Sequence, residues 1–455
     1  MIKTETGPAV LITGAAVLGK EPKDILIAGG TIVAVGQVGS LSEQIATEQE
    51  NRGEVLEIDG TGLVALPGLV DLHTHLREPG REDAETVASG TRAAALGGFT
   101  AVFAMANTSP VADTAGVVEQ VWRLGKESGY ADVYPVGAIT QGLAGKQLAE
   151  LSAMANSAAQ VRIFSDDGMC VNDPVLMRRA LEYVKTFDGI IAQHSQDHRL
   201  TENAQMNEGE VSAELGLTGW PAVAEEAIIA RDVLLAQHVN SRLHVLHVST
   251  AGSVDIIRWA KARGINVTAE ATPHHLMLTE EFARGYDPLF KVNPPLRTEA
   301  DVAALRAALA DGTIDIVGTD HAPHSSEYKQ CEWAAAAFGM TGLETALSVL
   351  QHTLIDTGVL DWERLAEATS TVPAQIAGLT DQGRPIAAGE PANLVLINPE
   401  AKRTVNPREH ASLSNNSPFT GMELPGQVVA TVLHGRPTVL GAKLVDPQNP
   451  ETWKA

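Results

Sequence analysis

The most constraining feature of the sequence is a series of eight apolar runs that each end in polar residues. Between residues 68 and 324 they read GLVDLHTH, TAVFAMA, DVYPVGAIT, VRIFSDDG, GIIAQHSQ, RLHVLHVST, NVTAEATPHHL and TIDIVGTDHAPH. Amphipathic stretches such as PVLMRRALEYVKTF and EADVAALRAALADG lie between them, several closed by Gly. Alternating apolar and amphipathic segments are typical of βα units. Eight such units predict an α/β protein with a (β/α)8 TIM barrel.

The two ends of the chain have a different residue pattern from the middle. Residues 10–36 and the runs ANLVLINP and GQVVATVLHGRP are short, β-rich and punctuated by Gly, a pattern typical of antiparallel hairpins. A polar, acidic stretch from residue 40 predicts a loop or weak helix before another short strand. We therefore expect a smaller β-sandwich-like domain built from residues 1–62 and 386–455, with the metal-dependent hydrolase barrel over residues 63–385.

Charge and composition exclude several classes of protein. Asp and Glu outnumber Lys and Arg by 56 to 33, and a formal charge of -23 repels nucleic acid. An anionic small molecule can still bind where a few cations line a pocket. With two cysteines, no basic leader and no apolar stretch of about 20 residues, the expected location is the cytoplasm, away from membranes.

Polar residues that could bind metal follow several of the predicted strands. His73 and His75 end the first run, and residues two apart on a strand face the same side. An isolated H-x-H is more often structural, but its place at a strand end favours a metal site. Equivalent positions in later runs hold Asp166, Asp167, His194, His247 and Asp320. Imidazole and carboxylate are zinc ligands, and this set suffices for two divalent ions that activate a water molecule.

A second group of polar residues lies just past the strand ends or in the loops that follow: Arg77, Asn107, Asn293 and His324. Arginine suits the paired hydrogen bonds that grip a carboxylate. A surface ion pair between Arg77 and Glu78 or Glu82 is an equally open interpretation.

The remaining histidines favour structural roles. Strand parity turns His244 away from His247 and predicts a core position for it. For His274 and His275 a supporting role beside the metal and a purely structural role stay open, and neither is assigned as a ligand.

The longer motifs DLHTHLREPG, FSDDG, QHSQD, HVST, NPPLR, GTDHAPH and FGMTGLET together resemble those of the class I, bacterial-type dihydroorotases of the amidohydrolase superfamily. The resemblance covers about residues 25–439. It implies a zinc enzyme, with two ions per chain, that reversibly cyclises N-carbamoyl-L-aspartate to L-dihydroorotate in the third step of pyrimidine (UMP) biosynthesis. A homodimer and an association with aspartate transcarbamoylase are further expectations from this resemblance.

The resemblance also implies roles for individual residues. Asp320 corresponds to the catalytic aspartate, which also touches metal, and Asp167 to a bridging ligand. The full metal-binding set is His73, His75, Asp167, His194, His247 and Asp320. The substrate-binding set is Arg77, Asn107, Asn293, His324, Phe338 and Gly339.

Two alternative functions remain. The first is a hydantoinase or dihydropyrimidinase, but many such relatives bridge their metals with a carboxylated lysine on the fourth strand, and VRIFSDDG has no lysine. The second is a non-catalytic partner of aspartate transcarbamoylase, which would be expected to lose metal ligands, whereas every one is present here.

Overall fold

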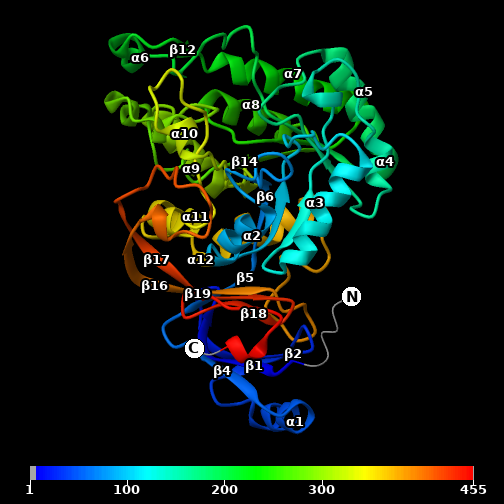
Figure 1. Ribbon diagram of the computed structural model, residues 1–455, viewed down its shortest axis with the longest axis vertical. Coiled ribbons are helices and arrows are strands. Elements are labelled where there is room, and N and C mark those ends of the chain that lie inside the picture. The colour runs from blue at the N-terminus through cyan, green and yellow to red at the C-terminus, as the bar shows by residue number, and fades with distance from the viewer. Residues whose placement is uncertain (1–6, 454–455) are drawn as a thin grey trace.

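The computed structural model describes residues 7–453, in which a barrel and a β-rich domain are stacked end to end (Figure 1). Each of the eight predicted runs contains one barrel strand. The strands are β6 (Leu69–Thr74), β7 (Phe99–Ala104), β8 (Asp132–Pro135), β9 (Ile163–Phe164), β10 (Ile190–Gln193), β13 (Leu243–Val245), β14 (Val267–Ala271) and β15 (Ile316–Val317). Neighbouring strands pair in parallel, and bridges from Gly137 to Phe164 and from Thr74 to His321 close the ring. The predicted (β/α)8 barrel is confirmed.

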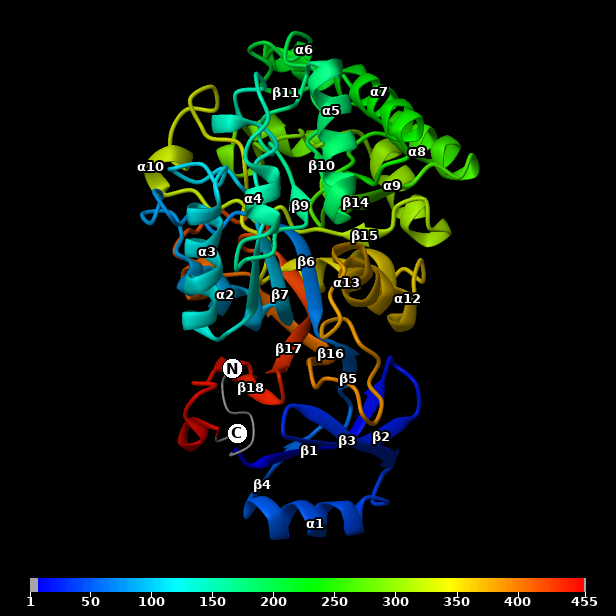
Figure 2. The same cartoon turned by 90° about the vertical axis from the view of Figure 1, so that its right-hand side faces the viewer.

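Amphipathic helices surround these strands (Figure 2). The longer ones are α2 (Val87–Leu96), α3 (Ala115–Ser128), α5 (Pro174–Val184), α7 (Val223–Val239), α8 (Ala251–Ala262) and α9 (Glu299–Asp311). Helix α5 begins where the Asp173 side chain accepts two backbone N–H groups and a proline occupies the first turn. Helix α9 begins with a capping box between Thr298 and Asp301 and ends at Gly312 in the left-handed region. Local sequence therefore fixes the start of both helices and the end of α9.

Shorter elements lie in the connections. They are α4 (Leu151–Ala155), α6 (Glu210–Leu215), α10 (Ser326–Lys329), α11 (Ala346–Leu350), α12 (Trp362–Ala366), α13 (Val372–Ala377) and the strand pair β11 (Met206–Asn207) and β12 (Gly219–Trp220). Within residues 7–453, none of the helices combines the length and the apolar character that crossing a bilayer would require.

Strands from both ends of the chain form one nine-stranded sheet. It contains β1 (Ala9–Val17), β2 (Pro22–Ala28), β3 (Thr31–Gln37), β4 (Val55–Asp59), β5 (Val64–Pro67), β16 (Leu394–Thr404), β17 (Glu423–Leu433), β18 (Arg436–Leu440) and β19 (Lys443–Leu444). The antiparallel pairing of β16 with β5 joins the two groups, so the C-terminal strands pair with the N-terminal ones as expected. The acidic stretch after β3 forms helix α1 (Ser42–Arg52).

The β16 strand serves two cores at once. Leu394 and Leu396 pack in the core of the β domain, whereas Val395 and Ile397 pack in the main core of the barrel. Successive side chains of a strand point to opposite faces, so one strand can join the two domains. The chain passes from β5 to β6 at Gly68, where a Cβ atom would overlap Thr100.

Candidate metal centre and substrate cavity

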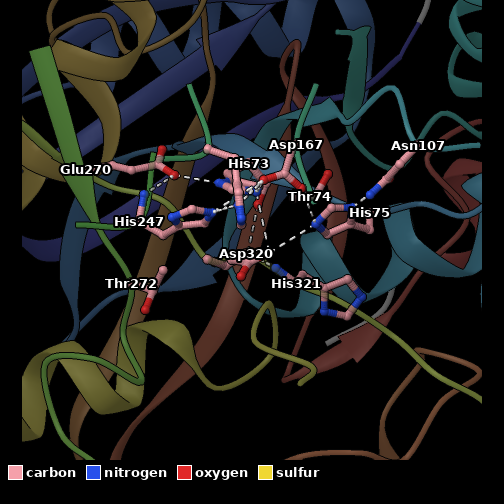
Figure 3. Close-up of polar contacts among 12 residues, drawn as sticks. His73, Thr74, His75, Asn107, Asp167, His247, Glu270, Thr272, Asp320 and His321 are labelled. Carbon is pink, nitrogen blue, oxygen red and sulfur yellow. Dashed lines mark hydrogen bonds and ion pairs between the residues drawn. The ribbon is translucent and has the colours of Figure 1, made fainter. Parts of the chain in front are cut away.

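The six predicted metal ligands meet at the carboxyl ends of the barrel strands. His73 lies in β6 and His75 directly after it, and the other four follow β9, β10, β13 and β15: Asp167, His194, His247 and Asp320. Figure 3 shows the side chains from β6, β9, β13 and β15 turned toward one another. All six are buried, although they come from five separate strands. This is the barrel face on which TIM-barrel enzymes place their chemistry.

Asp167 lies at the centre of this cluster. Its Oδ1 atom is 3.4 Å from His73 Nε2, 3.3 Å from His194 Nδ1 and 3.4 Å from His247 Nε2. Its Oδ2 atom is 3.3 Å from His75 Nε2. One carboxylate thus faces all four imidazoles, the position a bridging ligand requires.

Asp320 approaches the same cluster from the side of β15. Its Oδ1 atom lies 3.0 Å from His75 Nε2 and 3.4 Å from His73 Nε2. Burial opposes ionisation of Asp320, but the imidazoles of His73 and His75 outweigh it and lower the pKa of this carboxyl. The side chain is therefore ionised at neutral pH.

The electrostatics of the cluster are dominated by opposite charges in a buried space. Burial disfavours a charged His73, yet the carboxylates of Glu270, Asp167 and Asp320 raise the pKa of His73 well above its usual range. For Asp167 the positive partner His73 outweighs burial in turn and holds the pKa well below the usual range. Such a set of anionic and imidazole groups favours bound cations.

The free atoms of the cluster fit divalent metal. His73 Nε2 and Asp167 Oδ1 are buried and have no hydrogen-bond partner. His75 Nδ1 lies 2.9 Å from Asn107 Oδ1, an acceptor, which leaves Nε2 with its lone pair toward the cluster. Two ligand triplets, one with Asp167 and one with Asp320, each have their atoms within 4.8 Å of one another. Imidazole nitrogen and carboxylate oxygen are the donors that zinc prefers.

Glu270, on β14, is a site residue that sequence reasoning missed. Its Oε1 atom is 2.5 Å from His73 Nδ1 and accepts the His247 backbone N–H at 3.1 Å. Its Oε2 atom is 3.2 Å from His244 Nε2, which places the buried His244 behind the cluster. The available signal was a glutamate inside the apolar strand VTAEA, since a buried carboxylate needs partners. Glu270 orients His73 so that Nε2 points into the cluster.

Replacing Glu270 by Gln should weaken metal binding by about 10- to 100-fold, because the orienting charge behind His73 is lost while the side-chain size is kept. Competition titration with a zinc chelator measures the affinity. Glu344→Gln is the matched control, since Glu344 is also buried but bonds the Ala411 backbone N–H, away from the cluster. An unchanged zinc affinity in the Glu270 variant would refute the orienting role.

A cavity of about 260 Å³ opens beside the cluster. All six residues predicted to bind substrate line it, together with four of the predicted metal ligands: His75, Asp167, His194 and Asp320. The other two ligands, His73 and His247, lie outside its lining. Residues far apart in the sequence are thus brought together in one cavity.

Arg77 enters this cavity as a buried side chain. Its Nε donates to Pro323 O at 3.0 Å, and a terminal nitrogen lies 3.4 Å from His324 Nε2. The side chains of Glu78 and Glu82 accept backbone N–H groups instead of pairing with Arg77. The interpretation of Arg77 as a surface ion pair is therefore wrong.

The neighbouring groups complete a polar wall. Burial, and then the charge of Arg77, lower the pKa of His324 to about 2, so its imidazole is neutral. His324 Nε2 lies 2.8 Å from Phe338 O. Asn293 donates to Gln196 Oε1 at 3.2 Å and leaves its own Oδ1 without a partner.

Three other candidates, Asp166, His274 and His275, lie beside the cluster. Asp166 accepts the backbone N–H groups of residues 139 and 140, at 2.8 and 2.9 Å, and so supports a loop. His275 Nδ1 bonds the Thr272 hydroxyl at 2.8 Å, which favours the structural interpretation. His274 is buried with Nε2 unpartnered, and burial lowers its pKa to about 4.

A (β/α)8 barrel that gathers four imidazoles and two carboxylates beside an arginine-lined cavity defines the class of metal-dependent amidohydrolases. A family model described as dihydro-orotase-like matches residues 62–253. Curated dihydroorotases are similar over nearly their whole length. That of Streptomyces coelicolor is 66% identical, with 95% of this chain and 99% of the relative covered. That of Mycobacterium tuberculosis is 52% identical, with 96% and 99% covered. The chain belongs to the dihydroorotase family.

Solved structures with a similar fold are more distant in sequence. The L-hydantoinase (dihydropyrimidinase) of Arthrobacter aurescens superposes with a TM-score of 0.84 at 24% identity, over 97% of this chain and 98% of that one. A dihydropyrimidinase from Brevibacillus agri gives 0.79 at 23%, with 96% of each chain covered. At this identity the likeness shows a shared barrel and β domain and carries no information on substrate.

Proposed function

We propose that this chain is a dihydroorotase that interconverts N-carbamoyl-L-aspartate and L-dihydroorotate as a step of pyrimidine biosynthesis. The supporting observation is Arg77, a buried cation in the same cavity as the histidine and aspartate cluster. The substrate carries a carboxylate on its ring, and a guanidinium is the side chain best suited to hold one. Relatives of 52 to 66% identity carry the same name.

We propose two zinc ions as the cofactors, which the six residues of the cluster, Asp167 among them, would hold. Divalent ions bound there would lower the pKa of a water molecule and polarise a carbonyl. Asp320, ionised and buried at the cavity, accepts the proton of the attacking water and passes it to the ring nitrogen as the amide bond breaks. In the reverse direction it takes the proton from that nitrogen.

The other cavity residues orient the substrate. Arg77, with Asn107, would hold the carboxylate, and Asn293 and the neutral His324 would complete the pocket around the substrate. Gly339 has φ +134°, and a Cβ there would overlap Ala322 and His324. This position in the cavity lining therefore requires glycine. Without a side chain here, the backbone next to Phe338 stays accessible to the ring of the substrate.

Replacing Arg77 by Met should raise KM for dihydroorotate by about 10- to 100-fold, because a hydrogen bond to a charged group contributes about 1.5–3 kcal/mol. Steady-state kinetics on dihydroorotate and dihydrouracil measure the effect. The variant should lose its preference for the acidic ring, whereas Arg199→Met, a change at a 93% exposed side chain, should not. Unchanged discrimination in the Arg77 variant would contradict the carboxylate role.

The proposed function is tested by metal analysis of the purified protein together with an assay for carbamoyl aspartate formed from dihydroorotate. We expect two zinc ions per chain and turnover of dihydroorotate well above that of dihydrouracil. A preference for dihydrouracil would favour the hydantoinase alternative. Bound metal without turnover of either ring would favour the non-catalytic partner.

We also propose a cytoplasmic location and a homodimer that can associate with aspartate transcarbamoylase, with no nucleic-acid partner. The free thiols of Cys170 and Cys331 and the net charge of -23 support the location and the absence of nucleic acid. Sedimentation of the chain alone and mixed with the transcarbamoylase tests the assembly.

A further inference from the structure

Residues 325–339, here called the wall segment, form one side of the substrate cavity through Phe338 and Gly339. The segment contains the four-residue helix α10, yellow in Figure 1, and otherwise turns. Its exposed Tyr328 shows that it lies at the surface. Such a segment has little regular structure of its own and needs outside contacts to stay in place.

Two buried lysines supply those contacts. Lys291 Nζ donates to Trp333 O at 2.7 Å and to Ala334 O at 3.2 Å. Lys329 Nζ donates to Lys291 O at 3.1 Å and to Ala337 O at 2.9 Å. Both side chains are almost fully buried, with exposures of 2% and 3%.

These amines have no acidic partner. Among residues 7–453, no carboxylate lies within 4.0 Å of either Nζ atom, and their hydrogen bonds go to main-chain carbonyl oxygens alone. Burial, and then the charge of Lys291, lower the pKa of Lys329 to about 7, which reflects the cost of keeping this amine from solvent. A buried lysine that hydrogen-bonds main-chain oxygens holds those parts of the chain in position.

The lysines also connect the wall segment to the substrate residues. Lys291 precedes Asn293 by two positions, and its carbonyl accepts both Lys329 Nζ and the backbone N–H of Gly339, the latter at 3.0 Å. Lys291 Nζ lies 4.5 Å from the centre of the Phe338 ring. The same two residues thus fix the positions of Asn293, Phe338 and Gly339 relative to one another.

We propose that Lys291 and Lys329 are positioning residues that form a latch, hold the wall segment against the chain segment that carries Asn293 and so complete the substrate cavity. This inference rests on the proposed function for its kinetic part only. The two lysine side chains bond main-chain oxygens of the wall segment and of Lys291. Neither lysine lines the substrate cavity, so both act without contacting the reacting atoms.

Lys329→Met tests the latch, because methionine keeps the apolar stem and removes the donor. Hydrogen–deuterium exchange in the substrate-free protein should show faster exchange at Ala337 and Gly339, with the barrel strands unchanged. KM for dihydroorotate should rise by about 10-fold while kcat stays within about threefold, since positioning is lost and chemistry is kept. Lys329→Arg, which retains donors, should recover most of the KM.

The matched control is Lys402→Met, at a lysine that is 69% exposed, which should change neither measurement. Should Lys329→Met fail to fold, Lys291→Met removes the bonds to Trp333 and Ala334 and provides the same test. Unchanged exchange at 337–339, faster exchange throughout the barrel, or a fall in kcat at constant KM would each overturn the latch. If the wild type does not convert dihydroorotate, the proposed function fails, whereas the exchange measurement still decides on the latch.

Discussion

Asp320→Asn is expected to lower kcat by at least about 100-fold, equivalent to about 2.7 kcal/mol of transition-state stabilisation, while the protein keeps its metal. The amide cannot accept the proton that the ionised carboxylate takes from water. Asparagine preserves the size of the side chain. It also suits the backbone, because Asp320 has φ +47°, a region that Asn tolerates better than most residues. Single-turnover kinetics and metal analysis on the same sample measure both parts.

The control for this variant is Asp188→Asn. Asp188 also has a positive φ, at 54°, but its side chain is 88% exposed and it precedes β10, at the end of that strand opposite to His194. Wild-type kinetics in this control would show that the backbone region itself tolerates the change. If Asp320→Asn kept more than about one hundredth of the wild-type rate with metal bound, Asp320 would not be the general base.

Most of the barrel could be predicted from the sequence because its signal is periodic. Each of the eight apolar runs contains a strand, since strands buried on both faces must be apolar along their length. The convergence of the candidate metal ligands could be predicted for a related reason, since polar side chains at the ends of such runs meet at one face of the barrel. His73 and His194 follow this rule although 120 residues separate them.

Residues that act from behind the cluster gave a weaker signal. Glu270 stands within a strand rather than at its end, so strand-end reasoning passed over it. Arg77 could equally have been a surface residue. From the sequence alone, an ion pair with a neighbouring glutamate cannot be distinguished from a hydrogen bond to a distant backbone carbonyl. Lys291 and Lys329 bond only to main-chain oxygens, which no sequence pattern reveals. Contacts of this kind depend on how the loops fold over the barrel. A sequence pattern describes only neighbouring residues, so it cannot reveal them.

Removal of metal by a strong chelator should abolish turnover and lower the thermal stability of the protein. A ligand that binds only the folded state stabilises it by RT ln(1 + L/Kd), where L is the free ligand concentration, which is about 4 kcal/mol when L is a thousand times the dissociation constant. Without cations, Asp167 and Asp320 remain buried beside imidazoles whose charge alone must compensate them. Calorimetry before and after chelation measures the fall in Tm, and added zinc should restore both Tm and activity.

A second histidine and aspartate group provides the control for this prediction. His434 Nε2 lies 2.8 Å from Asp132 Oδ2, and with Asp381 these residues could also hold an ion. Asp132 begins β8, so this group lies at the opposite end of the barrel from the cluster. His434→Gln should therefore keep the full chelator-induced fall in Tm, whereas His247→Gln should lose most of it. The reverse result would place the stabilising metal at the base of the barrel and leave the histidines at the mouth without their proposed role.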